Sequence, residues 1–376
     1  MHFLTFIFKN TIRRPLRSAL TIVAIAVGIG AVVALVGIAG GFERSFFDLY
    51  KGVGVDLVVV RAGAKQRLNS AVDEGIGAQI RSIPGVKDVI PGLADVLSFE
   101  EQGMYGVLVQ GWIPESTVFK HITTLSGRSL KTDDERAVLV GHVLAKNLDK
   151  TVGDTIDLTD GEPFEVVGIY KSSNIFEDGA IVVPLKQLQR VMDRPGQVTG
   201  FSIQVNNHQD PAAIEQVRKG VESLGGGLTA MTTEDHVKSI SELQLVKAMA
   251  WLTSAVALVI GIFGIMNTMI MSVHERTKEI GILRALGWRK KRIVWMVLLE
   301  SVVMSLVGAF VGSVGAFLLV RLLTKVPTVS GVIDGRIELH NILNGFLIAV
   351  IVGLIGGLVP AIRATRLLPT EALHYE

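Results

Sequence analysis

The sequence predicts a membrane protein of four spanning helices that carries one large mixed α/β domain outside the bilayer. Four apolar runs contain no Asp, Glu, Lys or Arg. At about 1.5 Å per residue, about 20 such residues cross a hydrocarbon core of about 30 Å, and each run is at least that long. A polar block with the composition of a globular domain separates the first two runs. The runs cover residues 18–42, 248–273, 301–320 and 341–362.

The composition agrees with this class of protein. Hydrophobic residues make up 49% of the chain and charged residues 19%, and the mean hydropathy is +0.46. The chain has no cysteine, which excludes disulfides, cysteine-ligated zinc and thiol nucleophiles. The first apolar run is longer than the usual 7–15-residue core of a signal peptide, so we expect a retained span rather than a cleaved leader.

Basic residues gather in three clusters along the chain. Because the chain crosses the membrane four times, all three clusters lie on the same side. Short basic loops stay in the cytoplasm, so we expect a multi-pass protein of the inner (cytoplasmic) membrane with both termini cytoplasmic and the large domain extracytoplasmic. The clusters are Lys9, Arg13, Arg14 and Arg17; then Arg276, Lys278, Arg284, Arg289, Lys290, Lys291 and Arg292; and finally Arg363 and Arg366.

The spans divide the chain into consecutive segments. We expect a cytoplasmic N-terminus over 1–17, the first span over 18–42, the extracytoplasmic domain with its stalk over 43–243, the second span over 244–273, a cytoplasmic loop over 274–292, the third span over 293–323, a short outer loop over 324–340, the fourth span over 341–362 and a cytoplasmic tail over 363–376.

The extracytoplasmic domain alternates strand and helix. One β-α-β stretch lies near each end, which predicts two related halves, and a β-rich insert lies between them. Segments 43–50 and 233–247 join the domain to the spans without Pro or Gly, so we expect a helical stalk; the alternative is that they are short linkers. Strands are expected over 56–61, 86–90, 95–100, 104–112, 155–158, 164–169, 180–183, 202–205 and 228–231, and helices over 76–82, 141–148 and 211–223.

Motifs of catalysis are missing from the sequence. A Walker A loop needs Gly-Lys, and the chain has no such dipeptide. The eight histidines show no metal-ligand spacing, and no Gly-x-Ser-x-Gly elbow occurs. We therefore expect no catalytic residue, no metal site and no cofactor bound by this chain.

Polar and small residues inside the spans form a second group of candidates. Glu300 lies eight residues after Arg292, about 12 Å along a helix, and an ionised group at that depth is costly, so we expect it to face protein in a packing or hydrogen-bonding role. Asn267 is a polar residue of the second span. Gly308 and Gly312 have the GxxxG spacing; packing within one subunit is favoured over a helix–helix dimer face.

The loop between the second and third spans predicts a short amphipathic helix over 274–286. Ile280 with Leu283, and Ile282 with Leu286, have the spacing of one helical face, and Gly287 would end the helix. Composition alone leaves two interpretations open, a helix that docks on a cytoplasmic partner or a simple interfacial helix.

A family resemblance favours the docking interpretation. Residues 264–267 (GIMN), 275–281 (ERTKEIG) and 284–287 (RALG) resemble the signature of the FtsX-like/MacB family of ABC transporter permeases, the type VII transporters. The end of the fourth span, with Pro360-Ala361, Arg363-Ala364 and Arg366-Leu367, resembles the same family's C-terminal motif. The pieces 127–128, 138–141, 152–154 and 164–169 resemble its periplasmic core domain.

The resemblance implies a fold and a set of partners. It implies an FtsX-like permease domain over 248–373 and a MacB-like periplasmic core domain. We expect the chain to contact membrane lipid and not to bind nucleic acid. Two permeases, identical or paralogous, would pair with two ATPases that hold ATP and Mg²⁺; since 17 residues precede the first span, we expect those ATPases on separate chains. The implied ATPase-coupling residues are Glu275, Arg276, Lys278, Glu279, Ile280, Gly281, Leu283 and Arg284.

Several functions remain open. The leading hypothesis is mechanotransmission, in which cytoplasmic ATP hydrolysis moves the extracytoplasmic domain for export, with a periplasmic adaptor and an outer-membrane duct, or for extraction of a lipoprotein or lipid. The alternative is an FtsX-like signal transmitter that activates a cell-wall hydrolase or a sensor without moving cargo. A receptor without any ATPase would leave the coupling-like loop unexplained.

Overall fold

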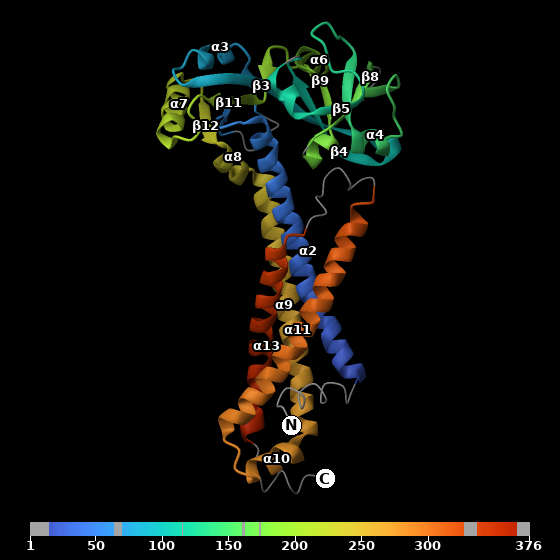
Figure 1. Ribbon diagram of the computed structural model, residues 1–376, viewed down its shortest axis with the longest axis vertical. Helices are drawn as coiled ribbons and strands as arrows, with labels where there is room; N and C mark the ends of the chain where they lie inside the picture. The colour runs from blue at the N-terminus through green and yellow to red at the C-terminus, as the bar shows by residue number, and fades with distance from the viewer. Residues whose placement is uncertain are drawn as a thin grey trace. The chain divides into compact units, whose positions relative to one another are not determined.

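A computed structural model describes residues 15–63, 70–114, 116–159, 162–172, 174–326 and 337–366 (Figure 1). The chain divides into two compact units. We call them the helical unit, with described residues 15–39, 246–322 and 337–366, and the sheet unit, with described residues 40–245 and 323–326.

Within the described residues, four helices are long and apolar enough to cross a membrane, and they contain the four predicted spans. Every backbone group inside a helix is satisfied within its own segment, which is why apolar runs cross a bilayer in this form. A short helix, α10, lies in the loop between the second and third spans. The bounds are α2 Pro15–Val53, α9 Ser241–Glu275, α10 Thr277–Ala285, α11 Lys290–Leu323 and α13 Leu339–Arg366.

The two expected stalk segments behave differently. Helix α2 continues without a break through 43–50 to Val53, as expected. The segment 233–247 is not one helix, because α8 (Thr233–Ser239) ends at Ile240, which has an extended backbone (φ −64°, ψ 111°). Ile240 is buried in an apolar cluster with Val58 and Val237, and this packing outweighs the local helical composition.

Small residues bring α11 and α2 into close contact in the helical unit. A Cβ on Gly308 would lie 2.6 Å from Ile25 Cγ2, and a Cβ on Gly312 would lie 3.0 Å from Ala26 Cα. Both glycines are buried. In this structure the GxxxG pair therefore packs against another helix of the same chain.

Among the described residues of the sheet unit, ten strands form a mixed sheet in the order β12-β1-β11-β3-β4-β9-β6-β8-β5, with β7 paired to β8. The two β-α-β stretches interleave, because β1 lies between β12 and β11 and all their pairings are antiparallel. They therefore build one four-stranded part of the sheet, a split β-α-β arrangement, instead of two separate bodies. The β-rich insert extends the same sheet through β4.

The strand and helix bounds of the sheet unit show which sequence signals were sufficient. The expected strands 86–90 and 95–100 are one long strand, β3, which passes through Pro91-Gly92. Among the elements that were not predicted are β5, which is exposed throughout, β6, which is buried throughout and so has no alternation, and the short helices α5 and α6. The two-residue strands β2 and β10 and the helices η2 and η3 were not predicted either. The strands are β1 Leu57–Arg61, β2 Val72–Asp73, β3 Val86–Phe99, β4 Met104–Trp112, β5 Thr123–Gly127, β6 Ala137–Gly141, β7 Thr155–Thr159, β8 Glu162–Lys171, β9 Ile181–Pro184, β10 Gln197–Val198, β11 Gly200–Val205 and β12 Leu228–Thr232, and the remaining helices are α3 Ile76–Arg81, α4 His142–Asn147, α5 Ile175–Asp178, α6 Leu185–Val191, α7 Pro211–Ser223, η2 Glu100–Gln102 and η3 Thr117–His121.

The four-stranded part of the sheet, made of β12, β1, β11 and β3, is covered on both faces (Figure 1). Leu57 and Val59 of β1 join the core under α3 and α7, while Val58 and Val60 join the cluster beneath α8 and the end of α2. Successive strand residues point to opposite faces, so an uninterrupted run of valines fits this position. The end of α2 is thereby part of the core of the sheet unit.

We predict that Gly312→Leu destabilises the helical unit by about 1–3 kcal/mol, since the new side chain would push into the α2 backbone. Thermal unfolding in mild detergent measures the effect. Gly315→Leu is the matched control on the same helix, because a Cβ there meets nothing within 4 Å. Equal unfolding temperatures for the two variants would contradict the packing argument.

Candidate functional site

The loop helix α10 is separated from the spans on both sides. Helix α9 ends at Glu275, and Arg276 leaves helical geometry (φ −103°, ψ 19°) before α10 begins at Thr277. At the other end Leu286 caps the helix and Gly287 takes a left-handed conformation (φ 91°) that suits glycine. The sequence therefore produces a short, bounded helix where 274–286 was expected.

Arg276 anchors this helix to the membrane helices. Its Nη1 lies 2.9 Å from Glu300 Oε2 on α11, and its Nε lies 3.1 Å from Glu279 Oε2 on α10. The Glu300 side chain is 7% exposed, so it faces protein. A buried charge that has lost its partner is strongly unfavourable, so this pair resists separation.

A second connection joins α10 to the fourth span. Arg284 Nη1 donates a hydrogen bond of 3.0 Å to the carbonyl oxygen of Thr365 on α13. Together, Arg276 and Arg284 connect α10 to both α11 and α13. A displacement of α10 would therefore be resisted by both helices or transmitted to them.

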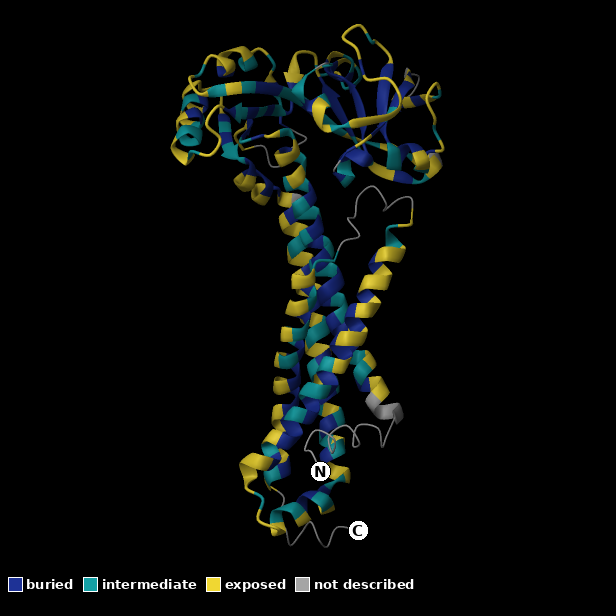
Figure 2. Cartoon of the chain, in the orientation of Figure 1, coloured by how far each residue is buried: buried dark blue, intermediate teal, exposed yellow. Residues whose placement is uncertain are grey.

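Helix α10 has a buried side and an exposed side (Figure 2). Thr277, Ile280 and Gly281 are buried on the side of α10 that faces the rest of the helical unit. Lys278, Ile282 and Leu286, at i, i+4 and i+8, form an exposed stripe, in which Ile282 is 49% and Leu286 74% exposed. We call these three residues the loop stripe. An exposed apolar pair beside a cation is suited to a protein partner.

The structure divides the predicted coupling residues into three groups by burial. Ile280 and Gly281 are buried, Glu275 and Lys278 are exposed, and Arg276, Glu279, Leu283 and Arg284 are half-buried. The exposed residues Ile282 and Leu286 were not part of the predicted site, although their i,i+4 spacing was the signal for them.

The remaining intramembrane candidate, Asn267, is exposed on α9. Large apolar side chains of the same helix, among them Val259, Ile260 and Phe263, are exposed as well. This face of α9 is therefore left for lipid or for another chain.

In the sheet unit, helix α5 forms a contact with α2. The Phe176 ring lies 5.5 Å from the Phe42 ring and 4.6 Å from the Phe46 ring, and these two residues are one turn apart on α2. The Asn174 side-chain amide donates to the Ser45 carbonyl oxygen, and its Oδ1 caps α5 by accepting from Phe176 N. We call Asn174 and Phe176 the α5 clamp.

The other side of α5 is fixed to the β-rich part of the sheet. Tyr170 of β8 donates a 2.6 Å hydrogen bond to the Glu177 carbonyl oxygen, and Ser172 Oγ donates to the Glu177 carboxylate. His142 Nδ1 lies 3.2 Å from Asp178 Oδ1. Helix α5 thus connects α2 to strand β8 and to His142 at the start of α4.

Burial raises the pKa of Glu177 to about 7, against the opposing hydrogen bond from Ser172. Burial also raises the pKa of the neighbouring Asp178. Burial at this site therefore disfavours the ionised form of both carboxyl groups.

Comparison with known proteins gives a consistent result. The family model described as MacB-like periplasmic core domain matches residues 18–222, and the one described as FtsX-like permease C-terminal matches residues 251–369. The chain is 27% identical over 391 residues to the uncharacterized ABC transporter permease MJ1507 of Methanocaldococcus jannaschii, covering 99% of this chain and 98% of that protein.

Two further matches concern proteins named MacB. The chain is 26% identical over 402 residues to the macrolide export ATP-binding/permease protein MacB of Bdellovibrio bacteriovorus, covering 98% of this chain and 61% of that protein. The crystal structure of the periplasmic region of MacB from Actinobacillus actinomycetemcomitans aligns over 50% of this chain and 94% of that one, with a TM-score of 0.40 and 12% identity.

We predict that the free energy of unfolding falls as the pH rises from about 5 to 8. In the folded state Glu177 keeps its proton up to about pH 7, whereas the unfolded chain releases it near pH 4.5; the folded state therefore binds more protons in this window, which amounts to about 3 kcal/mol. Glu177→Gln should remove most of this slope in thermal unfolding. Glu165→Gln, at an exposed carboxylate of the same sheet, should leave it unchanged, and equal slopes in all three proteins would contradict the assignment.

Proposed function

Because the chain belongs to the family of MacB-like and FtsX-like ABC transporter permeases, we propose that it is the membrane subunit that couples an ATPase to movement of the sheet unit. The observation that carries the proposal is the loop stripe on α10, together with the two arginines that connect this helix to α11 and α13. A partner that binds the stripe gains a direct mechanical connection to the spans.

The α10 side of the membrane is the cytoplasmic one in this proposal. The basic residues beside α10, Arg289, Lys290, Lys291 and Arg292, support this orientation, since short basic loops remain in the cytoplasm. Both termini then lie in the cytoplasm and the sheet unit is extracytoplasmic. ATP and Mg²⁺ are held by the partner, on a separate chain.

The movement caused by ATP hydrolysis would be transmitted along continuous helices. Helix α2 contains residues of both units without a break, and its end is part of the sheet unit's core. The α5 clamp offers a second point at which α2 can move the β-rich part of the sheet. Closure of two ATPases would bring two α10 helices together and shift the extracytoplasmic domains.

The exposed face of α9 would bind a second permease, identical or paralogous. The motion would serve export, with a periplasmic adaptor and an outer-membrane duct, or extraction of a lipoprotein or lipid. An FtsX-like transmitter is the alternative. Mass spectrometry of proteins that copurify in mild detergent distinguishes them: an adaptor or lipoprotein favours transport, and a cell-wall hydrolase or sensor favours signalling.

We predict that Ile282→Asp with Leu286→Asp lowers recovery of the copurifying ATPase at least tenfold, because the new carboxylates would have to be buried in the contact. Glu275→Lys should weaken binding less. The protein should still reach the membrane and elute as a folded species. Leu125→Asp, at an exposed leucine of the sheet unit, is the control; unchanged ATPase recovery in the double variant rejects the docking surface.

We predict that Phe176→Ala loosens α2 from the β-rich part of the sheet. Since the chain has no cysteine, spin labels can be placed at cysteines substituted for Asp48 on α2 and Lys146 on α4. Electron paramagnetic resonance should give a broader distance distribution for this pair in the variant. A reference pair at Asp48 and Lys219 of α7 should not change; a narrow distribution for the first pair would show that the clamp does not hold α2.

A further inference from the structure

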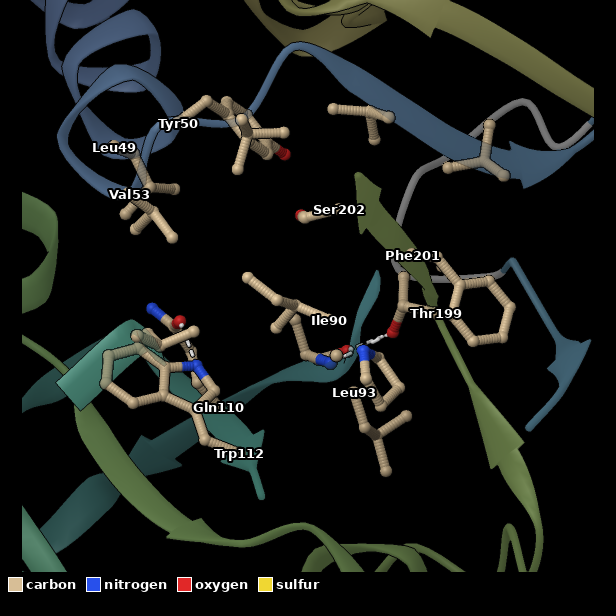
Figure 3. A pocket seen from close by; sticks show the side chains of 18 of the residues that line it. Leu49, Tyr50, Val53, Ile90, Leu93, Gln110, Trp112, Thr199, Phe201 and Ser202 are labelled. Atoms are coloured by element: carbon tan, nitrogen blue, oxygen red, sulfur yellow. Dashed lines mark hydrogen bonds between the residues drawn. The ribbon is translucent and has the colours of Figure 1, made fainter. Parts of the chain in front are cut away.

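A cavity of about 100 Å³ lies in the sheet unit where the end of α2 meets β1, β3, β4 and β11 (Figure 3). Its walls come from both the split β-α-β part and the β-rich part of the sheet. The cavity is partly open, and Leu49, Val53 and Ser202 of its lining are half-buried. Apolar residues that matter for the argument are Leu49, Tyr50 and Val53 of α2, Ile90 and Leu93 of β3, and Trp112 of β4.

One polar group has a fixed orientation in this wall. Trp112 Nε1 donates a 3.0 Å hydrogen bond to Gln110 Oε1. Because an indole N–H can only donate, the amide oxygen must face Trp112 and the amide nitrogen must point the other way. Figure 3 shows that nitrogen turned from the indole toward the side of Leu49 and Val53.

The Gln110 amide nitrogen has no protein partner among the described residues, although it is buried. The residue as a whole is 9% exposed. Buried donors are nearly always satisfied, and an unmade hydrogen bond costs free energy. A donor at the wall of a cavity is satisfied when a molecule that carries an acceptor occupies the cavity.

The surroundings disfavour a charged occupant. The described lining contains no Lys, Arg or His, and its carboxylate side chain is that of Glu177. Burial raises the pKa of Glu177 to about 7, which means that the site opposes even its own negative charge. The site is therefore suited to a neutral group.

We infer that this cavity is a ligand site for an uncharged apolar group of about four to five heavy atoms that carries a hydrogen-bond acceptor, and that Gln110 donates to that acceptor. An engineered apolar cavity of about 150 Å³ in another protein holds benzene, so the smaller cavity here, of about 100 Å³, matches a four-membered ring or a branched alkyl end. Most binding sites for small molecules share this design of apolar walls with few placed polar groups.

Assigning this cavity to the molecule that the transporter moves rests on the proposed function. Leu49, Tyr50 and Val53 line it from one end of α2, so an occupant contacts the helix that would carry the ATP-driven motion. The apolar end of the cargo would thereby be bound or released as α2 moves.

Cyclobutanone is the probe, since it has the size, neutrality and acceptor that the inference requires. Trp112 lines the cavity, and Phe replaces the other tryptophans, Trp251, Trp288 and Trp295, in the full-length chain. We expect a saturable change of Trp112 emission with Kd at about 1 mM, the range of weak fragments. The titration needs neither ATP nor an ATPase.

Two variants make the measurement specific. Gly92 lines the cavity, and a Cβ there meets nothing within 4 Å, so Gly92→Leu can fill the space without a backbone clash. It should abolish the saturable signal, while probe dissolved in detergent contributes equally to both proteins. Gln110→Met keeps the volume but removes the donor, and should weaken binding at least fivefold.

No saturable signal in the parent chain, or an unchanged one in Gly92→Leu, would overturn the site. An unchanged Kd in Gln110→Met would overturn the assigned ligand class. Gel filtration and the Trp112 emission maximum confirm that each variant is folded. Failure of this titration leaves ATPase docking on α10 intact, and loss of docking leaves the titration intact, so the two proposals fail separately.

Discussion

The ion pair between Arg276 and Glu300 is the interaction on which the loop site depends. A carboxylate on a spanning helix is unfavourable unless a counter-charge reaches it, and Arg276 reaches it at 2.9 Å. The same guanidinium bonds Glu279 on α10. One arginine therefore neutralises a buried charge and fixes the loop helix, which leaves Lys278, Ile282 and Leu286 on the outward side.

In the sheet unit the corresponding constraint is that α2 ends inside the core. Tyr50 packs with Val55, Val58 and Val60 in one apolar cluster, so the helix end is held by the first strand of the sheet. Helix α5 holds the same segment from the β-rich side through Phe176 and Asn174. A single helix end thus contacts both parts of the sheet, and a cavity remains where the three meet.

The buried polar groups beside the end of α2 lie in the same apolar surroundings. Gln110 is oriented by Trp112, and Glu177 is held by Ser172. Both line the same cavity. Apolar walls raise the energy of charges and of unmade hydrogen bonds alike, so a small movement of α2 would change the conditions for an occupant and for the Glu177 proton together.

The spans, the loop helix, most strands and the family followed from the sequence alone, because apolar length, helical spacing and the 275–287 motif are local signals. Interleaving of the two β-α-β stretches was decided by tertiary pairing of β1 with β11 and β12, over separations that no local pattern records. The break at Ile240 came from burial that overrides helical composition. The pairing of Arg276 with Glu300, the outward turn of Ile282 and Leu286, and the cavity at Gln110 likewise exist only once distant segments pack, since contact and exposure are properties of the folded chain.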